Sequence, residues 1–117
     1  MELICYENCS TCKMAKKWLL DNELEFEERD IKKNRPNERE LREWYKKSGL
    51  TLDKFFNKNG LLYRALELKD QLPYMAENEQ LRLLASDGML IKRPILIADN
   101  GKILVGFNES EWETVKK

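Results

Sequence analysis

Two cysteines separated by two residues are the part of the sequence best suited to chemistry. Cys9 and Cys12 enclose Ser10 and Thr11, where a short apolar run gives way to a predicted helix. The first amide hydrogens of a helix lack backbone partners and the helix dipole is positive there, so an anion such as a thiolate is stabilised. This placement lowers the pKa of a cysteine below its ordinary value of about 8.5. Lys13 adds a nearby positive charge.

The spacing brings both sulfurs onto one helical turn, near enough to form a disulfide. We expect Cys9, at the exposed end, to be the nucleophile and Cys12 to be the resolving thiol that releases a mixed disulfide. The rival interpretation is half of a zinc site, but such a site needs about four ligands and only Cys5 remains to join the pair. We therefore predict redox use and no bound metal, while a cluster that bridges two subunits stays an open alternative. Cys5 is interpreted as a small buried hydrophobe.

Composition excludes several other classes of function. The chain contains no histidine, which rules out Ser–His and Cys–His nucleophile activation and histidine-containing zinc or haem sites. Lysine plus arginine equals aspartate plus glutamate, at 21 each, so there is no basic field and direct nucleic-acid binding is not expected. No stretch approaches the roughly 18 apolar residues of a membrane span, and no export leader is evident. With three cysteines, we expect a cytoplasmic protein with reduced thiols and no membrane contact.

The order of elements predicts an α/β domain over residues 1–117. A strand at 3–6 is followed by a helix from about Ser10, with an apolar stripe of Met14, Ala15, Trp18 and Leu19. A polar edge strand is predicted around 25–31, and residues of about 36–88 form a helical insert. Apolar runs at 95–98 and 103–105, joined through Asn100-Gly101, predict a hairpin. A capping box at 108–111 then opens a last helix.

Lys92-Arg93-Pro94 precedes that hairpin and could form the second half of the site. A proline at the first position of a strand avoids the loss of a ladder hydrogen bond, which is the purely structural interpretation. The functional interpretation is a cis Pro94 that faces the dithiol. Arg93 is then either a solvated surface cation or, if folding brings it to the sulfurs, a group that stabilises a thiolate or binds an oxyanion.

Four motifs together resemble the ArsC/Spx family of glutaredoxin-like arsenate reductases and Spx-type regulators. They are the dithiol, Lys16-Lys17-Trp18-Leu19, Lys92-Arg93-Pro94-Ile95 and Val105-Gly106-Phe107-Asn108. The resemblance extends over essentially the whole chain, including the insert. It implies a thioredoxin-like fold with a glutaredoxin-type βαβ…ββα core and a helical insertion.

The resemblance also implies roles for individual residues. It places Cys9 and Thr11 on the nucleophile loop of the family, and Arg93 on the arginine before the cis proline. The residues expected to bind the substrate or anion are Ser10, Thr11, Arg93 and Pro94. Arg64 is a looser match to a second anion-binding arginine. No bound cofactor is implied, and the electron donors are glutathione with glutaredoxin, or thioredoxin.

Three functions follow from the resemblance and remain open. The first is a thiol–disulfide oxidoreductase that uses Cys9 and Cys12. The second is an Spx-like redox-sensing regulator that binds the C-terminal domain of the RNA polymerase α subunit, since the Cys-x-x-Cys form looks more like the Spx branch. The third is a glutathione/glutaredoxin-dependent arsenate reductase, although Cys12 and Lys13 stand where those enzymes usually carry serine and arginine.

Overall fold

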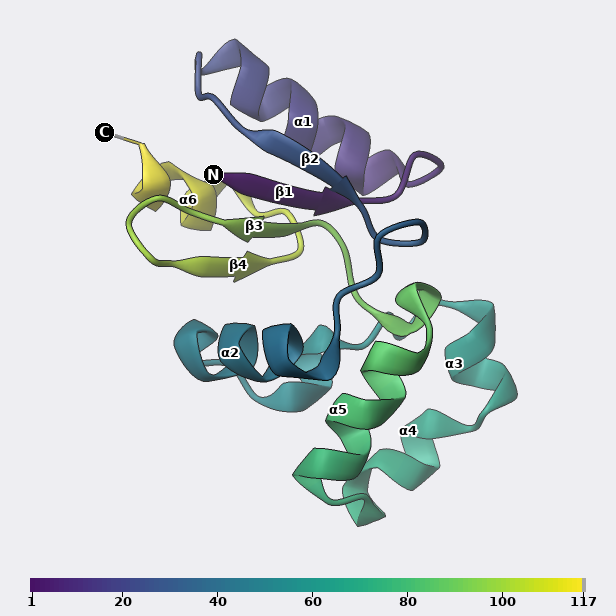
Figure 1. Cartoon of the computed structure of the whole chain (residues 1–117). Helices are drawn as coiled ribbons and strands as arrows, with labels where there is room; N and C mark the ends of the chain where they lie inside the picture. Colours follow the sequence, from purple (N-terminus) through teal and green to yellow (C-terminus); the bar gives the residue numbers. More distant parts are fainter. Residues whose placement is uncertain (117) are drawn as a thin grey trace.

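A four-stranded mixed sheet forms the centre of the fold in a computed structural model that describes residues 1–116 (Figure 1). The strands are β1 (Glu2–Cys5), β2 (Glu27–Asp30), β3 (Ile95–Ile97) and β4 (Ile103–Val105), in the order β2-β1-β3-β4. β1 pairs with β2 in parallel, and the other two pairings are antiparallel. β2 is polar because it lies at the edge, as its sequence indicated.

Residues 1–116 also contain six α-helices and four short 3-10 helices, of which one of each kind follows the last strand. The α-helices are α1 (Ser10–Asp21), α2 (Glu38–Ser48), α3 (Leu61–Ala65), α4 (Leu68–Gln71), α5 (Glu77–Ser86) and α6 (Glu109–Trp112). The 3-10 helices are η1 (Leu52–Phe55), η2 (Leu72–Tyr74), η3 (Gly88–Leu90) and η4 (Glu113–Val115). This order confirms the predicted strand–helix–strand unit, helical insert and hairpin–helix unit. None of the helices in residues 1–116 combines the length and apolarity needed to cross a bilayer.

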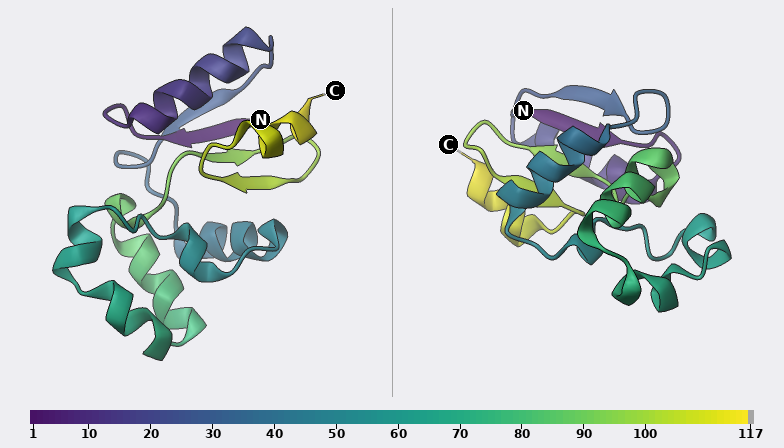
Figure 2. Two further views of the ribbon diagram at one scale, coloured as in Figure 1. Left: turned by 180° about the vertical axis from the view of Figure 1, so that it is seen from behind. Right: turned by 60° about the horizontal axis from the view of Figure 1, so that its bottom comes forward.

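The two faces of the sheet are covered by different parts of the chain. Successive side chains of a strand point to opposite faces, so Leu3 and Ile4 enter separate clusters. Leu3 packs with Leu19 of α1 and Trp112 of α6. Ile4 packs with residues of the insert, and Figure 2 shows α1 and the insert on opposite sides of the sheet.

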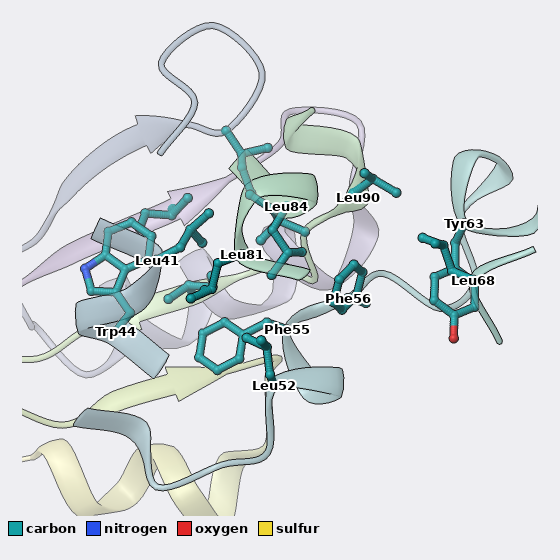
Figure 3. Packing of buried hydrophobic residues seen from close by; sticks show 14 of the residues in the cluster. Leu41, Trp44, Leu52, Phe55, Phe56, Tyr63, Leu68, Leu81, Leu84 and Leu90 are labelled. Carbon is teal, nitrogen blue, oxygen red and sulfur yellow. The ribbon is translucent and has the colours of Figure 1, made fainter. Parts of the chain in front are cut away.

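The insert is held by its own apolar core. Figure 3 shows Phe55 and Leu52 beside Leu81 of α5, close to Trp44 of α2. α2 begins at a capping box in which the Asn37 side chain accepts from the Glu40 N–H, at 2.8 Å. It ends at Gly49, whose positive φ of 73° favours glycine. These local signals fix the two ends of α2 within the predicted helical insert.

One prediction about α1 is wrong. Met14 was placed in the apolar stripe, but its side chain is 57% exposed. The buried positions are Cys12, Ala15, Trp18 and Leu19, so the stripe begins at the second cysteine.

The extent of the domain is a separate prediction. That residues 1–117 form a single domain stays a prediction, and residue 117 lies outside the described residues.

Candidate active site

The dithiol lies at the junction between β1 and α1. Cys9 is the residue before the first turn of α1, with extended backbone angles. Its N–H donates to the Tyr6 carbonyl at 3.1 Å, and its own carbonyl accepts from the Lys13 N–H at 3.2 Å. Cys9 therefore stands at the start of the helix, where the sequence placed it. Both cysteines are free thiols in this structure.

The two sulfurs differ in their access to solvent. Cys9 is half-buried and lines a cavity, whereas Cys12 is 2% exposed and packs against Ala15 and Trp18. This is the expected order, with one thiol at the open end of the helix and the other a turn inside. Only Cys9 could be reached directly by a bulky substrate in the large cavity.

Several donors converge on the Cys12 sulfur. The Cys5 thiol donates a hydrogen bond to it and is the largest cause that lowers its pKa, to about 6. The Tyr6 N–H, 3.5 Å away, and the Cys9 thiol also donate to it, while burial acts in the opposite direction. Hydrogen bonds to the charged form favour that form. The structure therefore stabilises a thiolate on the buried sulfur of the pair.

Arg93 approaches the dithiol from the strand side. The Arg93–Pro94 peptide bond is cis, as the functional interpretation required, and Pro94 is buried. The Arg93 guanidinium lies over the Tyr6 ring at 5.1 Å, and its charge contributes a smaller lowering to the pKa of Cys12. Its Nε and Nη1 atoms are buried and have no hydrogen-bond partner within residues 1–116. Two donors are therefore available beside the site.

A cavity of about 660 Å³ opens in front of Cys9. Four cations contribute to its lining, against the single carboxylate of Glu111. The lining residues come from four segments of the chain: Cys9, Thr11, Lys54, Phe56, Asn57, Lys58, Asn59, Lys92, Arg93, Val105, Gly106, Phe107, Asn108 and Glu111. The excess of positive charge favours an anionic ligand.

Backbone hydrogen bonds explain why the insert reaches this cavity. Phe56 and Ile91 form an isolated antiparallel bridge. The Lys92 N–H donates to the Phe55 carbonyl at 2.8 Å, and the Asn57 N–H donates to the Leu90 carbonyl at 2.7 Å. The loop after η1 is thereby fixed alongside the segment that leads to Arg93.

Another part of the cavity lining comes from the end of β4 and the residues that follow it. The Gly106 N–H donates to the Pro94 carbonyl at 2.8 Å, and the Gly106 carbonyl accepts from Trp112 Nε1 at 3.1 Å. Gly106 has a φ of 79°, a conformation that residues with a Cβ rarely adopt. Phe107 then packs edge-on against Trp112, with ring centroids 4.9 Å apart. This glycine turn places Phe107 at the cavity.

Two of the remaining predicted site residues, Ser10 and Arg64, lie apart from the cavity lining. Ser10 is exposed at the start of α1, and Arg64 is exposed on α3. Neither residue lines the cavity, whereas Thr11 does. Their predicted roles in binding stay predictions.

Sequence reasoning missed several residues of the site. Lys54, Asn57 and Lys58 fall within the predicted helical insert, and nothing in the local sequence indicates that this part of the insert meets the dithiol. Phe107 belongs to the Val105-Gly106-Phe107-Asn108 motif, which by itself does not indicate that its ring lines a cavity. Tyr6 was counted as part of the first strand, which ends at Cys5.

The arrangement is suited to thiol chemistry. Within the part of the chain that the structure describes, no group of three or more cysteine, aspartate or glutamate side chains is disposed to hold a metal ion. An accessible thiol beside a buried, stabilised thiol can form a disulfide and exchange it with an incoming thiol or disulfide. The site therefore defines an α/β protein of the thioredoxin-like class with a potential dithiol centre.

Comparison with known proteins gives the family. The ArsC family model matches residues 5–115, so the chain belongs to the ArsC family. The uncharacterized protein YusI of Bacillus subtilis is 53% identical over 108 residues, covering 92% of this chain and 91% of YusI. The regulatory protein MgsR of the same organism is 31% identical, covering 96% of this chain and 86% of MgsR. The global transcriptional regulator Spx of Enterococcus faecalis is 30% identical, covering 89% of this chain and 76% of Spx.

Solved structures agree with this assignment. An ArsC family related protein from Bacteroides fragilis superimposes with a TM-score of 0.95 at 44% identity, over 98% of this chain and 96% of that one. A possible arsenate reductase from Streptococcus mutans UA159 gives a TM-score of 0.85 at 45% identity, over 96% of both chains. The predicted thioredoxin-like α/β fold is thus confirmed, and so is the resemblance to the ArsC/Spx family. The family contains both regulators and proteins named as reductases.

Proposed function

We propose that this protein is a thiol–disulfide oxidoreductase in which Cys9 attacks a disulfide and Cys12 resolves the intermediate. One observation carries the proposal: the accessible sulfur of the pair faces a cavity, while the buried sulfur accepts three hydrogen bonds. A reductase of this kind needs one thiol that meets the substrate. It also needs a second thiol, ionised near neutral pH, that acts only on the first.

The reaction conserves atoms and electrons in two displacements. The Cys9 sulfur attacks one sulfur of the substrate disulfide, so a mixed disulfide forms and the first substrate thiolate leaves. The hydrogen bond from the Cys9 thiol to the Cys12 sulfur gives the Cys9 proton an acceptor in this step. The Cys12 sulfur then attacks the Cys9 sulfur, after losing any proton it accepted, and the second substrate thiolate leaves. The protein has lost two electrons and holds a Cys9–Cys12 disulfide.

The charge of the cavity indicates the class of substrate and reductant. Lys54, Lys92 and Arg93 contribute to its lining, together with Lys58, which is paired with Asp53 at 2.9 Å. The unpartnered nitrogens of Arg93 suit a carboxylate or another oxyanion. We infer that the site accepts anionic thiols and disulfides of the glutathione type. Glutathione with glutaredoxin, or thioredoxin, would return the disulfide to the dithiol.

Arsenate reduction is a second candidate that draws on the same arginine. An oxyanion beside Cys9 could accept hydrogen bonds from Arg93, and one structural relative is named a possible arsenate reductase. Arg64, the other predicted anion ligand, is exposed on α3 and does not line the cavity. Arg93 alone is weaker support for a dedicated arsenate site than the dithiol is for disulfide exchange.

A redox-sensing regulator is the third candidate. MgsR and Spx are named as regulators and match most of this chain. A reversible Cys9–Cys12 disulfide could act as a switch, with the C-terminal domain of the RNA polymerase α subunit as the partner. The balanced charge of the chain suits a protein partner better than DNA.

NADPH-coupled turnover distinguishes the three candidates. The purified protein would be assayed with glutathione and glutaredoxin, or with thioredoxin, against oxidised glutathione, a neutral disulfide and arsenate. We expect turnover of the disulfides that is abolished in Cys9→Ser and strongly reduced in Cys12→Ser. Preference for arsenate would favour the second candidate. Absence of turnover, together with a reversible Cys9–Cys12 disulfide, would favour the regulator and make polymerase binding the next measurement.

A further inference from the structure

A third thiol contacts the dithiol from the interior. Cys5 is the last residue of β1 and is 8% exposed. Its thiol donates a hydrogen bond to the Cys12 sulfur, and the two side chains pack in the same cluster. The proposed reaction gives Cys5 no part beyond this hydrogen bond. A sulfur in direct contact with the resolving thiol is nevertheless a potential disulfide partner.

Cys12 lies between two thiols that face different cavities. Cys9 lines the large cavity, whereas Cys5 and Cys12 line a second cavity of about 130 Å³ between α1 and β2. Cys9 does not line this smaller cavity. Lys16 of α1 and Glu28 of β2 do, and their side chains form an ion pair. The inner pair of sulfurs therefore has its own polar surroundings.

The charges around Cys5 change when Cys12 is oxidised. In the reduced protein the pKa of Cys5 is strongly raised, first by the hydrogen bond it donates to Cys12, then by burial, and by the charges of Cys12 and Glu28. Lys16 acts in the opposite direction. A Cys12 sulfur held in a disulfide carries no negative charge, so the largest cause that raises the pKa of Cys5 and the charge of Cys12 are both removed, whereas burial, Glu28 and Lys16 still act on the Cys5 thiol.

We propose that Cys5 is a third redox-active residue, which exchanges with the Cys9–Cys12 disulfide to form a Cys5–Cys12 disulfide. The Cys5 sulfur attacks the Cys12 sulfur, the Cys5–Cys12 bond forms and the Cys9–Cys12 bond breaks. Cys9 leaves as a thiolate and takes up the proton that Cys5 lost. No external oxidant or reductant is needed for this step. The inference rests on the proposed function, which supplies the first disulfide.

The consequence is a disulfide moved from the substrate cavity into the interior. Cys9 returns to the thiol state while the protein still holds both oxidising equivalents. A reductant in the large cavity could then reduce the protein only after the exchange reverses and the Cys9–Cys12 disulfide forms again.

Peptide mapping of the oxidised protein tests the exchange. The full chain is oxidised with oxidised glutathione, quenched in acid, alkylated and digested with a glutamate-specific protease. Cleavage after Glu7 separates Cys5 from the other two cysteines. We expect a disulfide-linked pair of peptides, 3–7 with 8–23, in which fragmentation finds the alkyl group on Cys9. A digest that contains only a looped peptide 8–23, with Cys5 fully alkylated, overturns the proposal.

Matched variants locate the bond. Oxidation of Cys9→Ser with diamide should link Cys5 to Cys12 within one chain. Cys12→Ser keeps Cys5 and Cys9. Within residues 1–116 these two thiols have no hydrogen bond to each other, so this variant should yield no such link. A Cys12→Ser digest that links as readily as Cys9→Ser would mean non-selective oxidation and would overturn the assignment of the inner pair.

Cys5→Ala separates this inference from the proposed function. The variant lacks the third thiol but keeps the dithiol, so its peptide 8–23 should be looped and lighter by two hydrogen atoms. If the loop forms in Cys5→Ala and the wild type shows no linked pair, only the exchange is contradicted. If Cys5→Ala forms no loop at all, the proposed function itself fails.

Discussion

Cys12 is the residue on which the polar contacts of the site converge. Its sulfur accepts from two thiols and from the Tyr6 N–H, although it is 2% exposed. Burial of an unpaired thiolate would be costly, so these donors are what allow the sulfur to be charged inside the protein. Cys9 supplies access to substrate and Cys12 supplies the ionised sulfur for the second step.

The pH dependence of disulfide closure tests this division of roles. The hydrogen bonds from the Cys5 thiol and the Tyr6 N–H are retained in the mixed disulfide and keep the pKa of Cys12 below its ordinary value, so its reactive thiolate is present above the lowered pKa and is lost as the pH falls through it. We expect the closure rate of a preformed Cys9 mixed disulfide to be flat near neutral pH and to fall about tenfold per unit at lower pH. Rapid-quench mass spectrometry measures this rate. A rate that keeps rising toward pH 9 would mean an ordinary, unstabilised thiol.

Arg93 should determine the preference for anionic substrates. Its Nε and Nη1 atoms have no partner in residues 1–116, and it lines the cavity. Loss of a charge-assisted hydrogen bond costs about 1.5–3 kcal/mol, so Arg93→Ala should raise KM for oxidised glutathione by roughly tenfold or more. Arg82→Ala, which removes an exposed arginine of α5, is the control. An equal loss with a neutral disulfide would indicate a structural role for Arg93 instead.

Local sequence signals predicted the elements that carry the dithiol. The junction at Cys9 depends on neighbouring residues, and it is where the sequence placed it. Met14 is exposed because the buried stripe of α1 runs through Cys12, Ala15, Trp18 and Leu19, and a residue two positions after Cys12 points away from that face of the helix. The separate helices α3 and α4 were not resolved within the insert, since short helices carry little periodicity of their own.

An ion pair joins β2 to the insert. Arg29 donates to both carboxylate oxygens of Glu40, at 2.6 and 2.9 Å, and its side chain is only 11% exposed. The guanidinium also lies over the Trp44 ring, 5.8 Å from its centroid. This pair connects the edge strand to the first helix of the insert.

Arg29→Ala should destabilise the protein by about 1–3 kcal/mol, because two charge-assisted hydrogen bonds are lost. Arg29 holds the pKa of Glu40 below its ordinary value, so this contribution is present above the ordinary glutamate pKa and fades as the pH falls through the lowered one. Urea unfolding at neutral and acid pH measures both effects. Lys47→Ala, which breaks the exposed pair with Glu43, should leave stability nearly unchanged, because solvent screens such pairs.

The cavity is a property of the whole molecule. Its lining comes from segments at 9–11, 54–59, 92–93 and 105–111, which are brought together by docking of the insert against the sheet. The dithiol and Arg93 could be predicted as parts of a site because each belongs to a motif. Lys54 and Asn57 could not, because their position depends on the pairing of Phe56 with Ile91 and on no local pattern.

Gly88 controls how the insert returns to the sheet. A Cβ at this position would overlap the backbone carbonyl of Ile31, which cannot move away as a flexible side chain can. Gly88→Ala should therefore cost about 1–3 kcal/mol from overpacking and reduce turnover by disturbing the approach of Arg93. Thermal unfolding and turnover measure the two effects, and Ser86→Ala at an exposed position is the control. Unchanged stability would contradict the close approach of the two segments.

Trapping the mixed disulfide tests the central claim most directly. Cys12→Ser is incubated with oxidised glutathione, quenched in acid and mapped by mass spectrometry, beside Cys9→Ser as the matched variant. We predict one glutathione per chain on Cys9 of Cys12→Ser and little or none on Cys9→Ser, because only Cys9 faces the large cavity. A glutathione adduct that forms on Cys12 of Cys9→Ser, while Cys9 stays unmodified in Cys12→Ser, would contradict the assignment of Cys9 as the nucleophile.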